Sequence, residues 1–242
     1  MMGDDKQTEL YVRLKKKKCE EYGFEHKGIV LSKETTELQV IQQVQKLNDD
    51  HTVSGILIQL PLSPHINTDK VLGEISPEKD VDGLRPMSED EKPLYVSCTA
   101  KGCIYIIQES VSSVKGNCAV VLGQSHMIGK PVTYCLKELG ANVIPCKGDE
   151  ENIRSITRKA DILVAAVEVP NVVKGDWIKP GALVVDSGSN LIDNGKVVGD
   201  VNFEEAVKVA GKITPVPGGV GPMIIAMLMD NLFLAWKRKN FK

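Results

Sequence analysis

The sequence lacks three features that would assign it to a specialised class of protein: an excess of charge of either sign, closely spaced cysteines, and long apolar runs. Its 242 residues contain 30 Lys and Arg against 32 Asp and Glu, and this balance argues against a dedicated nucleic-acid binder, which would carry a basic excess. The six cysteines form no C-x-x-C pair and no metal-ligand spacing, so we expect free thiols in a reducing compartment and no bound metal.

No apolar run reaches the roughly 18 residues that a membrane helix needs. The polar residues 1–6 do not resemble a signal or transit peptide. We therefore expect neither a membrane nor a nucleic acid as a partner. The cytoplasm is the expected location, and the mitochondrial matrix stays open as an alternative. With 42% hydrophobic and 26% charged residues, the composition is that of a globular protein.

Helical patterns alternate with short apolar segments, which predicts an α/β protein with parallel sheets and right-handed crossovers. We predict strands at residues 26–31, 55–60, 118–122, 142–145, 162–167 and 182–186. We predict helices at residues 11–22, 35–48, 67–75, 99–108, 130–139, 153–159, 203–210 and 223–238. A polar stretch at residues 85–92 marks the boundary between two α/β units.

The first unit contains polar residues in positions suited to a ligand. Tyr11 and Lys15 are four residues apart, so a helix places both on one face. Without further motifs this would be a surface pair, and Lys16–Lys18 are expected to form a solvated helical face. Gln59 ends an apolar strand, and open parallel sheets bind ligands beyond the carboxyl ends of their strands.

The second unit contains a glycine turn between a predicted strand and helix. Gly123 and Gly129 stand in a G-x-S-x-x-x-G spacing, which is typical either of a dinucleotide phosphate turn or of a plain turn in an α/β sheet. Lys147 follows the next strand and favours NADP over NAD, although an exposed turn lysine explains it equally well. The Pro- and Gly-rich residues 215–222 open into an apolar helix, and so rigid a loop indicates ligand contact.

Together these motifs resemble the bifunctional methylenetetrahydrofolate dehydrogenase/methenyltetrahydrofolate cyclohydrolase family. The similarity extends over almost the whole chain. The motifs that carry it are Tyr-x-x-x-Lys at 11–15, Gly-Ile-Leu-Ile-Gln-Leu-Pro-Leu at 55–62, Lys-Asp-Val-Asp-Gly at 79–83, Cys-Thr-x-x-Gly at 98–102, Gly-x-Ser-x-x-x-Gly-x-Pro at 123–131, Trp-Ile-Lys-Pro-Gly at 177–181, Gly-Asp-Val at 199–201 and Pro-Val-Pro-Gly-Gly-Val-Gly-Pro-Met at 215–223.

The resemblance implies oxidation of 5,10-methylenetetrahydrofolate to the 5,10-methenyl form with NADP, or with NAD, and hydrolysis to 10-formyltetrahydrofolate by a homodimer. Lys15 would be the catalytic lysine, with Tyr11 stacked on the folate, Gln59 assisting and Asp82 holding the pterin. Substrate contacts are expected from Tyr11, Gln59, Leu60, Asp82, Pro217 and Gly218. Cofactor contacts are expected from Thr99, Gly123, Gln124, Ser125, Lys147, Ala166, Ser187, Ser189 and Ile224.

The resemblance also implies a domain organisation. Residues 1–98 would form a catalytic folate-binding domain and residues 99–223 a Rossmann-like NAD(P)-binding domain. Residues 224–242 would form a C-terminal helix that packs back on the first domain. Long helices would link the two units, with a cleft between them. The resemblance further implies that the family's first helix and most of its first strand are missing ahead of Met1.

Several residues depart from the family's pattern, mainly on the cofactor side. Gln124 replaces an arginine that can contact the 2′-phosphate, and Glu168 replaces a glycine. Ser187 and Ser189 replace apolar residues, and Ile224 replaces a threonine. We therefore expect the dehydrogenase activity to be affected more than the cyclohydrolase activity. The alternatives are a non-catalytic or cyclohydrolase-only protein, which binds folate or dimerises with an active subunit, and an unrelated Rossmann oxidoreductase.

Overall fold

The computed structural model describes residues 6–86, 92–192 and 195–241, and their side chains from residue 12 onward. The chain folds as two compact units. Unit 1 contains Met1–Val96 and Leu228–Lys242, and unit 2 contains Ser97–Met227.

Unit 2 is built on a parallel sheet of five strands in the order β2-β1-β3-β4-β7. The strands are β1 (Cys118–Leu122), β2 (Asn142–Cys146), β3 (Ile162–Ala165), β4 (Leu183–Asp186) and β7 (Lys212–Ile213). A separate antiparallel pair is formed by β5 (Asn190–Leu191) and β6 (Val197–Val198). The predicted α/β class with a parallel sheet is confirmed.

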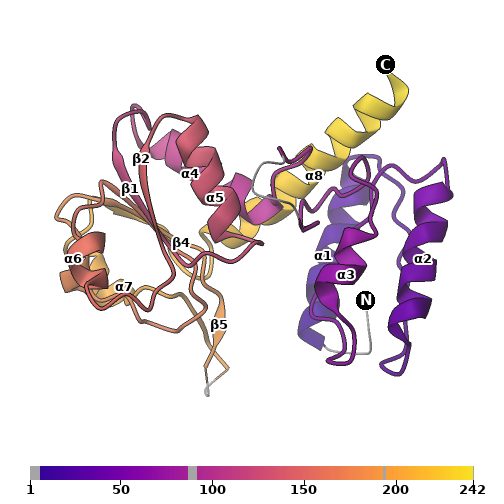
Figure 1. Cartoon of the computed structure of the whole chain (residues 1–242), viewed down its shortest axis with the longest axis horizontal. Coiled ribbons are helices and arrows are strands. Elements are labelled where there is room, and N and C mark those ends of the chain that lie inside the picture. The colour runs from indigo at the N-terminus through magenta and orange to yellow at the C-terminus, as the bar shows by residue number, and fades with distance from the viewer. Residues whose placement is uncertain (1–5, 87–91, 193–194, 242) are drawn as a thin grey trace. The chain divides into compact units, whose positions relative to one another are not determined.

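Helices lie on both sides of this sheet (Figure 1). They are α4 (Cys98–Ser110), α5 (Gly129–Glu138), α6 (Ile153–Thr157), α7 (Phe203–Ala206) and the 3-10 helix η1 (Gly175–Trp177). Because both faces are covered, the central strands are continuously apolar, and Val120, Leu163 and Val184 are fully or almost fully buried. The carboxyl ends of these strands position the loops described below.

Unit 1 contains α1 (Lys6–Glu21), α2 (Glu37–Asp49) and α3 (Thr68–Gly73). The α2 helix begins at a capping box, in which the hydroxyl of Thr36 accepts from the backbone of Gln39 and the Gln39 side chain accepts from the backbone of Thr36. One buried apolar cluster of this unit contains Val40, Ile41, Val44, Ile56, Ile66, Val71, Leu72 and Ile75.

The two strands predicted in unit 1 are wrong as regular strands. Residues 26–30 belong to no strand, and Leu31 forms only a single bridge. Within 55–60 the described residues form one isolated parallel bridge, between Ile56 and Asp80. To form a strand, a segment must be hydrogen-bonded to a neighbouring strand. An apolar segment needs only to be buried, which it can be without such pairing. Ile56 satisfies the second condition by packing against α2 and α3.

The last helix, α8 (Val220–Asn240), begins in unit 2 and ends in unit 1. It is long and apolar enough to cross a membrane by length and composition, although the sequence analysis predicts no membrane helix. Core helices of globular proteins meet the same criterion. In unit 1 the buried Asn231 donates hydrogen bonds to the carbonyls of Val81 and Val96, at 3.0 and 3.1 Å, so this part of α8 packs against protein.

Candidate active site

Lys15 differs from the three lysines that follow it because its side chain is half-buried and meets Gln59. Its Nζ donates a hydrogen bond of 3.0 Å to Oε1 of Gln59. Nε2 of Gln59 donates at 2.9 Å to the carbonyl of Leu60, which turns the amide oxygen toward Lys15. Lys16–Lys18 are exposed and pair with glutamates on the same helix. The structure therefore separates one lysine of the run from a solvated face.

The Lys-Asp-Val-Asp-Gly loop is held by its first two residues. Nζ of Lys79 donates to the carbonyls of Leu47, Asn48 and Asp50 at the end of α2, at 2.6 to 3.0 Å. The buried carboxylate of Asp80 accepts from the backbone N–H groups of Gly83 and Arg85, at 3.1 and 2.9 Å.

Burial raises the pKa of Asp80, and these N–H groups act in the opposite direction. Asp80 is therefore engaged by its own loop. Asp82, the residue predicted to hold the pterin, is half-buried.

The segments that carry Gln59 and Asp82 run side by side in the same direction. The N–H of Ile56 donates to the carbonyl of Lys79 at 2.7 Å, and the bridge from Ile56 to Asp80 is parallel. Gln59 and Asp82 both follow this bridge by two or three residues, so unit 1 brings them to one end of the paired segments. Tyr11 lies in α1 one turn before Lys15, and its side chain is outside the described residues.

In unit 2 the turn after β1 requires glycine at two positions. Gly123 has a φ of +94°, and a Cβ there would lie 1.9 Å from the carbonyl oxygen of Ala166. A Cβ at Gly129 would lie 1.9 Å from the carbonyl oxygen of Gly123. Gly129 begins α5, whose N-cap residue is Ile128 and has no side-chain acceptor. A tight glycine turn that opens a helix without a side-chain cap suits a pyrophosphate.

The side chain of Gln124 is folded onto this turn. Its Nε2 donates to the carbonyls of Val121 and Gly123, at 3.1 and 2.9 Å, and to the hydroxyl of Thr133 at 3.3 Å. The amide thus stabilises the turn from inside and carries no charge. Gln124 therefore does not supply the cationic contact expected from the family's arginine. Its amide is neutral, and its Nε2 points to the carbonyls of the turn.

The tip of β2 is closed by an acid that the sequence analysis did not single out. The carboxylate of Glu150 accepts from the backbone N–H groups of Lys147 and Gly148, at 2.6 and 2.9 Å. The side chain of Lys147 is exposed. Glu150 follows the end of β2 by four residues, and this spacing alone does not predict the contact. The contact depends on the backbone turn at Gly148, which has a φ of +109°.

The loop after β3 has a residue other than glycine in the left-handed backbone conformation that favours glycine. Glu168 has a φ of +58°, and its side chain is exposed beyond the end of β3. The buried carboxylate of Asp200 accepts from the N–H groups of Val167, Glu168 and Val169, at 2.7 to 3.1 Å. Asp200 belongs to the Gly-Asp-Val motif, and its buried position shows that this motif fixes a loop.

A second buried carboxylate, Asp186 at the end of β4, lies next to Asp200. It accepts from the N–H groups of Gly188, Asp200 and Val201, at 2.9 to 3.0 Å. Burial raises the pKa of Asp186 to about 6, and the neighbouring charge of Asp200 adds to this shift. The two acids therefore tie three loops together at the carboxyl edge of the sheet.

Other residues predicted on the cofactor side lie in the first turns of helices or in the turn after β1. Thr99 lies in the first turn of α4 and Ile224 in the first turns of α8. The hydroxyl of Ser125, an exposed residue, accepts from the N–H of Ile128 at 3.3 Å.

The loops after β3, β4 and β7 contain the other predicted contacts. Ser187 donates through its hydroxyl to the carbonyl of Ala165 at 2.8 Å, so this side chain is committed to the protein. Ser189 is exposed, and Ala166 is buried. Pro217 and Gly218 are exposed, and Gly218 has a φ of +111°.

The cysteines do not extend the site. All six are free thiols. Burial raises the pKa of Cys103 to about 12 and that of Cys146, at the tip of β2, to about 11, so neither forms a thiolate near neutrality. Within the described ranges no group of three His, Cys, Asp or Glu residues could hold a metal ion.

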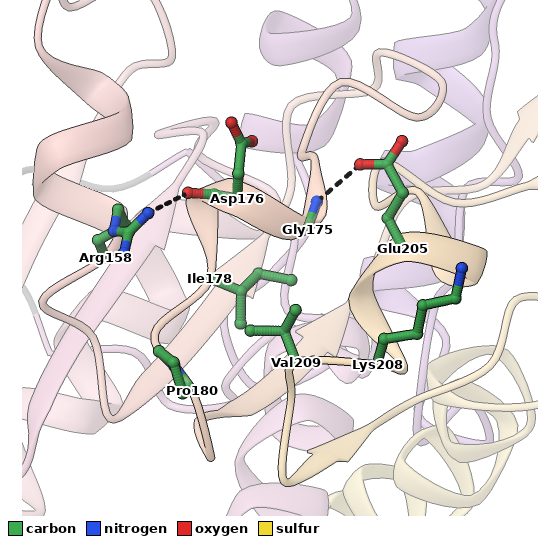
Figure 2. Close-up of a pocket in the computed structure, with 8 residues that line it drawn as sticks. All are labelled: Arg158, Gly175, Asp176, Ile178, Pro180, Glu205, Lys208 and Val209. Carbon is green, nitrogen blue, oxygen red and sulfur yellow. Dashed lines mark hydrogen bonds between the residues drawn. The ribbon is translucent and has the colours of Figure 1, made fainter.

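A hollow of about 430 Å³ in unit 2 is lined by Arg158, Gly175, Asp176, Ile178, Pro180, Glu205, Lys208 and Val209 (Figure 2). Its rim is fixed by hydrogen bonds from Arg158 to the carbonyl of Asp176 and from the N–H of Gly175 to Glu205. Pro180 precedes β4, whereas the nucleotide loops follow their strands. The hollow is therefore separate from the nucleotide side and contains none of the predicted site residues.

Comparisons with known proteins agree with both units. Residues 1–82 match the catalytic domain of tetrahydrofolate dehydrogenase/cyclohydrolase, and residues 97–240 match its NAD(P)-binding domain. The chain is 42% identical to "Bifunctional protein FolD 4, chloroplastic" of Arabidopsis thaliana, covering 100% of this chain and 71% of that protein. It is 44% identical to "Bifunctional protein FolD" of Acetivibrio thermocellus, covering 98% and 85%.

A solved structure is similar over the same length. It is the N5,N10-methylenetetrahydrofolate dehydrogenase-cyclohydrolase of Trypanosoma brucei, complexed with NADP and an inhibitor. The TM-score is 0.92 at 36% sequence identity, and the match covers 100% of this chain and 86% of that one.

Proposed function

The chain belongs to the tetrahydrofolate dehydrogenase/cyclohydrolase family, and from this premise we propose how its residues carry out the two reactions. It is an NAD(P)-dependent enzyme that oxidises 5,10-methylenetetrahydrofolate and hydrolyses the methenyl product to 10-formyltetrahydrofolate. The observation that carries the proposal is the hydrogen bond from Lys15 to Gln59 beside the Asp82 loop.

Hydrolysis is the step that needs proton transfer. Water that attacks the methenyl carbon must lose a proton, and we assign the amine of Lys15 to accept it. The hydroxyl of the adduct then gives up its proton to N5 as the C–N5 bond breaks, which leaves the formyl group on N10. Gln59 holds the lysine nitrogen in one direction, since its own amide is fixed by the carbonyl of Leu60. Asp82 would bind the pterin and Tyr11 would stack on it, so that the methenyl carbon faces Lys15.

Oxidation needs positioning more than proton transfer, because the methylene carbon of the substrate is already prone to lose hydride. When bound, NADP or NAD would supply the hydride acceptor. The chain would hold its pyrophosphate at the turn of Gly123 and Gly129, where close backbone packing leaves no space for a Cβ. Ser125 and Thr99 would add hydroxyl contacts, and Pro217 with Gly218 would line the folate.

Assembly and location are further proposals. A homodimer, which the family resemblance implies, is tested by sedimentation of the purified chain. The free cysteines fit a reducing compartment, which the cytosol and the mitochondrial matrix both provide. Relatives include a chloroplastic and a bacterial protein, so microscopy of the tagged chain is the direct test.

A spectrophotometric assay tests the proposed function by following appearance and decay of the methenyl form with NADP and with NAD. We expect both phases. Appearance without decay, or decay of added methenyl substrate without its formation, would leave a protein with one activity. Binding of folate without either phase would support the non-catalytic alternative. Absence of folate binding would contradict the proposal altogether.

A further inference from the structure

The tip of β2 is where a Rossmann-type domain meets the ribose that distinguishes NAD from NADP. A carboxylate there accepts hydrogen bonds from the ribose diol of NAD, whereas a cation binds the 2′-phosphate of NADP. In this chain the carboxylate of Glu150 folds back to the tip and lies against the N–H groups of Lys147 and Gly148. Each oxygen receives one N–H and retains acceptor capacity for a hydroxyl group.

Glu150 is ionised near neutrality. Partial burial raises the pKa of its carboxyl, but the two backbone N–H groups, together with the charge of Lys147, hold the pKa below its usual value. The same N–H groups would otherwise be donors for a phosphate. Glu150 therefore opposes a 2′-phosphate in two ways, by its charge and by occupying these donors.

Neighbouring side chains add to the effect. Gln124 is neutral and its Nε2 is engaged by the carbonyls of the turn, so it supplies no charge-assisted contact. Glu168 is exposed beyond the end of β3 and adds a second negative charge at this edge of the sheet. Lys147 is the opposing cation, and its charge helps to lower the pKa of Glu150.

We propose that Glu150 is a specificity-determining residue that selects against the 2′-phosphate, so that the chain binds NAD at least as tightly as NADP. This inference rests on the proposed dehydrogenase function, because it requires the nucleotide to bind at the turn of Gly123.

Calorimetric titration with 5′-AMP and with 2′,5′-ADP tests the inference without catalysis. Wild type is expected to bind 5′-AMP at least as tightly as 2′,5′-ADP. Glu150→Gln removes the charge and keeps an acceptor oxygen, and it should shift the affinity ratio toward 2′,5′-ADP by about tenfold. The matched control is Glu151→Gln, which makes the same change of net charge at an exposed neighbouring position and should leave the ratio unchanged.

Each other outcome has a separate meaning. A wild type that prefers 2′,5′-ADP by tenfold or more would overturn the inference, whatever the variants do. Equal changes for both ligands in Glu150→Gln would also overturn it, since they would reveal only a structural role in the loop. If wild type bound neither ligand nor NADP, the proposed dehydrogenase function would fail, and with it the premise.

Discussion

The folate side and the nucleotide side of this protein are built on different principles. In unit 1 the predicted side chains themselves meet: Lys15 contacts Gln59, and the Asp82 loop runs beside the same segment. In unit 2 close backbone packing shapes the turn after β1, and the side chain of Gln124 is folded onto that turn. Gly123 and Glu168 both have positive φ, although only one of them is glycine.

This difference follows from what each side must do. A proton-transfer site depends on one amine in one place, because no neighbouring group can replace its lone pair. A dinucleotide turn works largely through backbone N–H groups and the start of a helix, so it tolerates new side chains provided that the chain path is kept. The two activities should therefore respond separately to substitution.

The largest difference between the effects on the two activities is expected from Lys15→Met. Loss of the amine should lower the cyclohydrolase kcat by about 10²- to 10⁴-fold, because general acid–base groups contribute on that order. Nucleotide binding should be unchanged. Lys16→Met, which removes an exposed lysine of the same run, is the control and should retain activity. Full cyclohydrolase activity in Lys15→Met would contradict the assignment.

Gly123→Ala should impair unit 2, by lowering either its stability or its affinity for the nucleotide. Its Cβ would meet the backbone oxygen of Ala166 at 1.9 Å, which no side-chain rotation relieves, so we expect a loss of about 3 kcal/mol or more in stability or nucleotide affinity. Gly116→Ala is the matched control, with a φ of +84° and no heavy atom within 4 Å of the added Cβ. Similar nucleotide titrations for the two variants would argue against a packing requirement at the turn.

The buried pair of acids in unit 2 gives a pH-dependent prediction. The pKa of Asp186 rises from 3.8 to about 6 on folding, so the folded state binds the proton more tightly. This contribution to stability is present below about pH 4 and is lost as the pH rises through about 6. The unfolding free energy of wild type minus that of Asp186→Asn should fall by about 2 kcal/mol between pH 4 and 7 in urea titrations. A constant difference would show that Asp186 does not titrate in this range.

The smallest effect is expected from Glu168→Gly. A left-handed conformation costs a residue with a side chain about 1 kcal/mol, so glycine should raise the unfolding free energy by that amount. Removing the exposed carboxylate should also favour nucleotide binding. Asn171→Gly, at a φ of +54°, is the control and should gain less, since asparagine tolerates this region. A destabilised Glu168→Gly would mean that the side chain has a role of its own.

The sequence predicted the strands of unit 2 more reliably than those of unit 1. Strands such as β3 are buried on both faces, so the apolar runs of unit 2 coincide with the strands of its sheet. Residues 55–60 have the same apolarity but only one bridge, and a pairing partner is not encoded in the segment itself. The direction of Gln124 and the fold-back of Glu150 depend on turn geometry and close contacts, which spacing along the chain does not describe.

The carboxylate of Asp200 collects three successive amide hydrogens from residues 167–169, a segment outside every helix and strand. In deuterated solvent these hydrogens should therefore exchange far more slowly than those of an ordinary loop. Mass spectrometry of one short peptide would then report whether this edge of the domain is intact, even in a preparation that contains neither folate nor nucleotide.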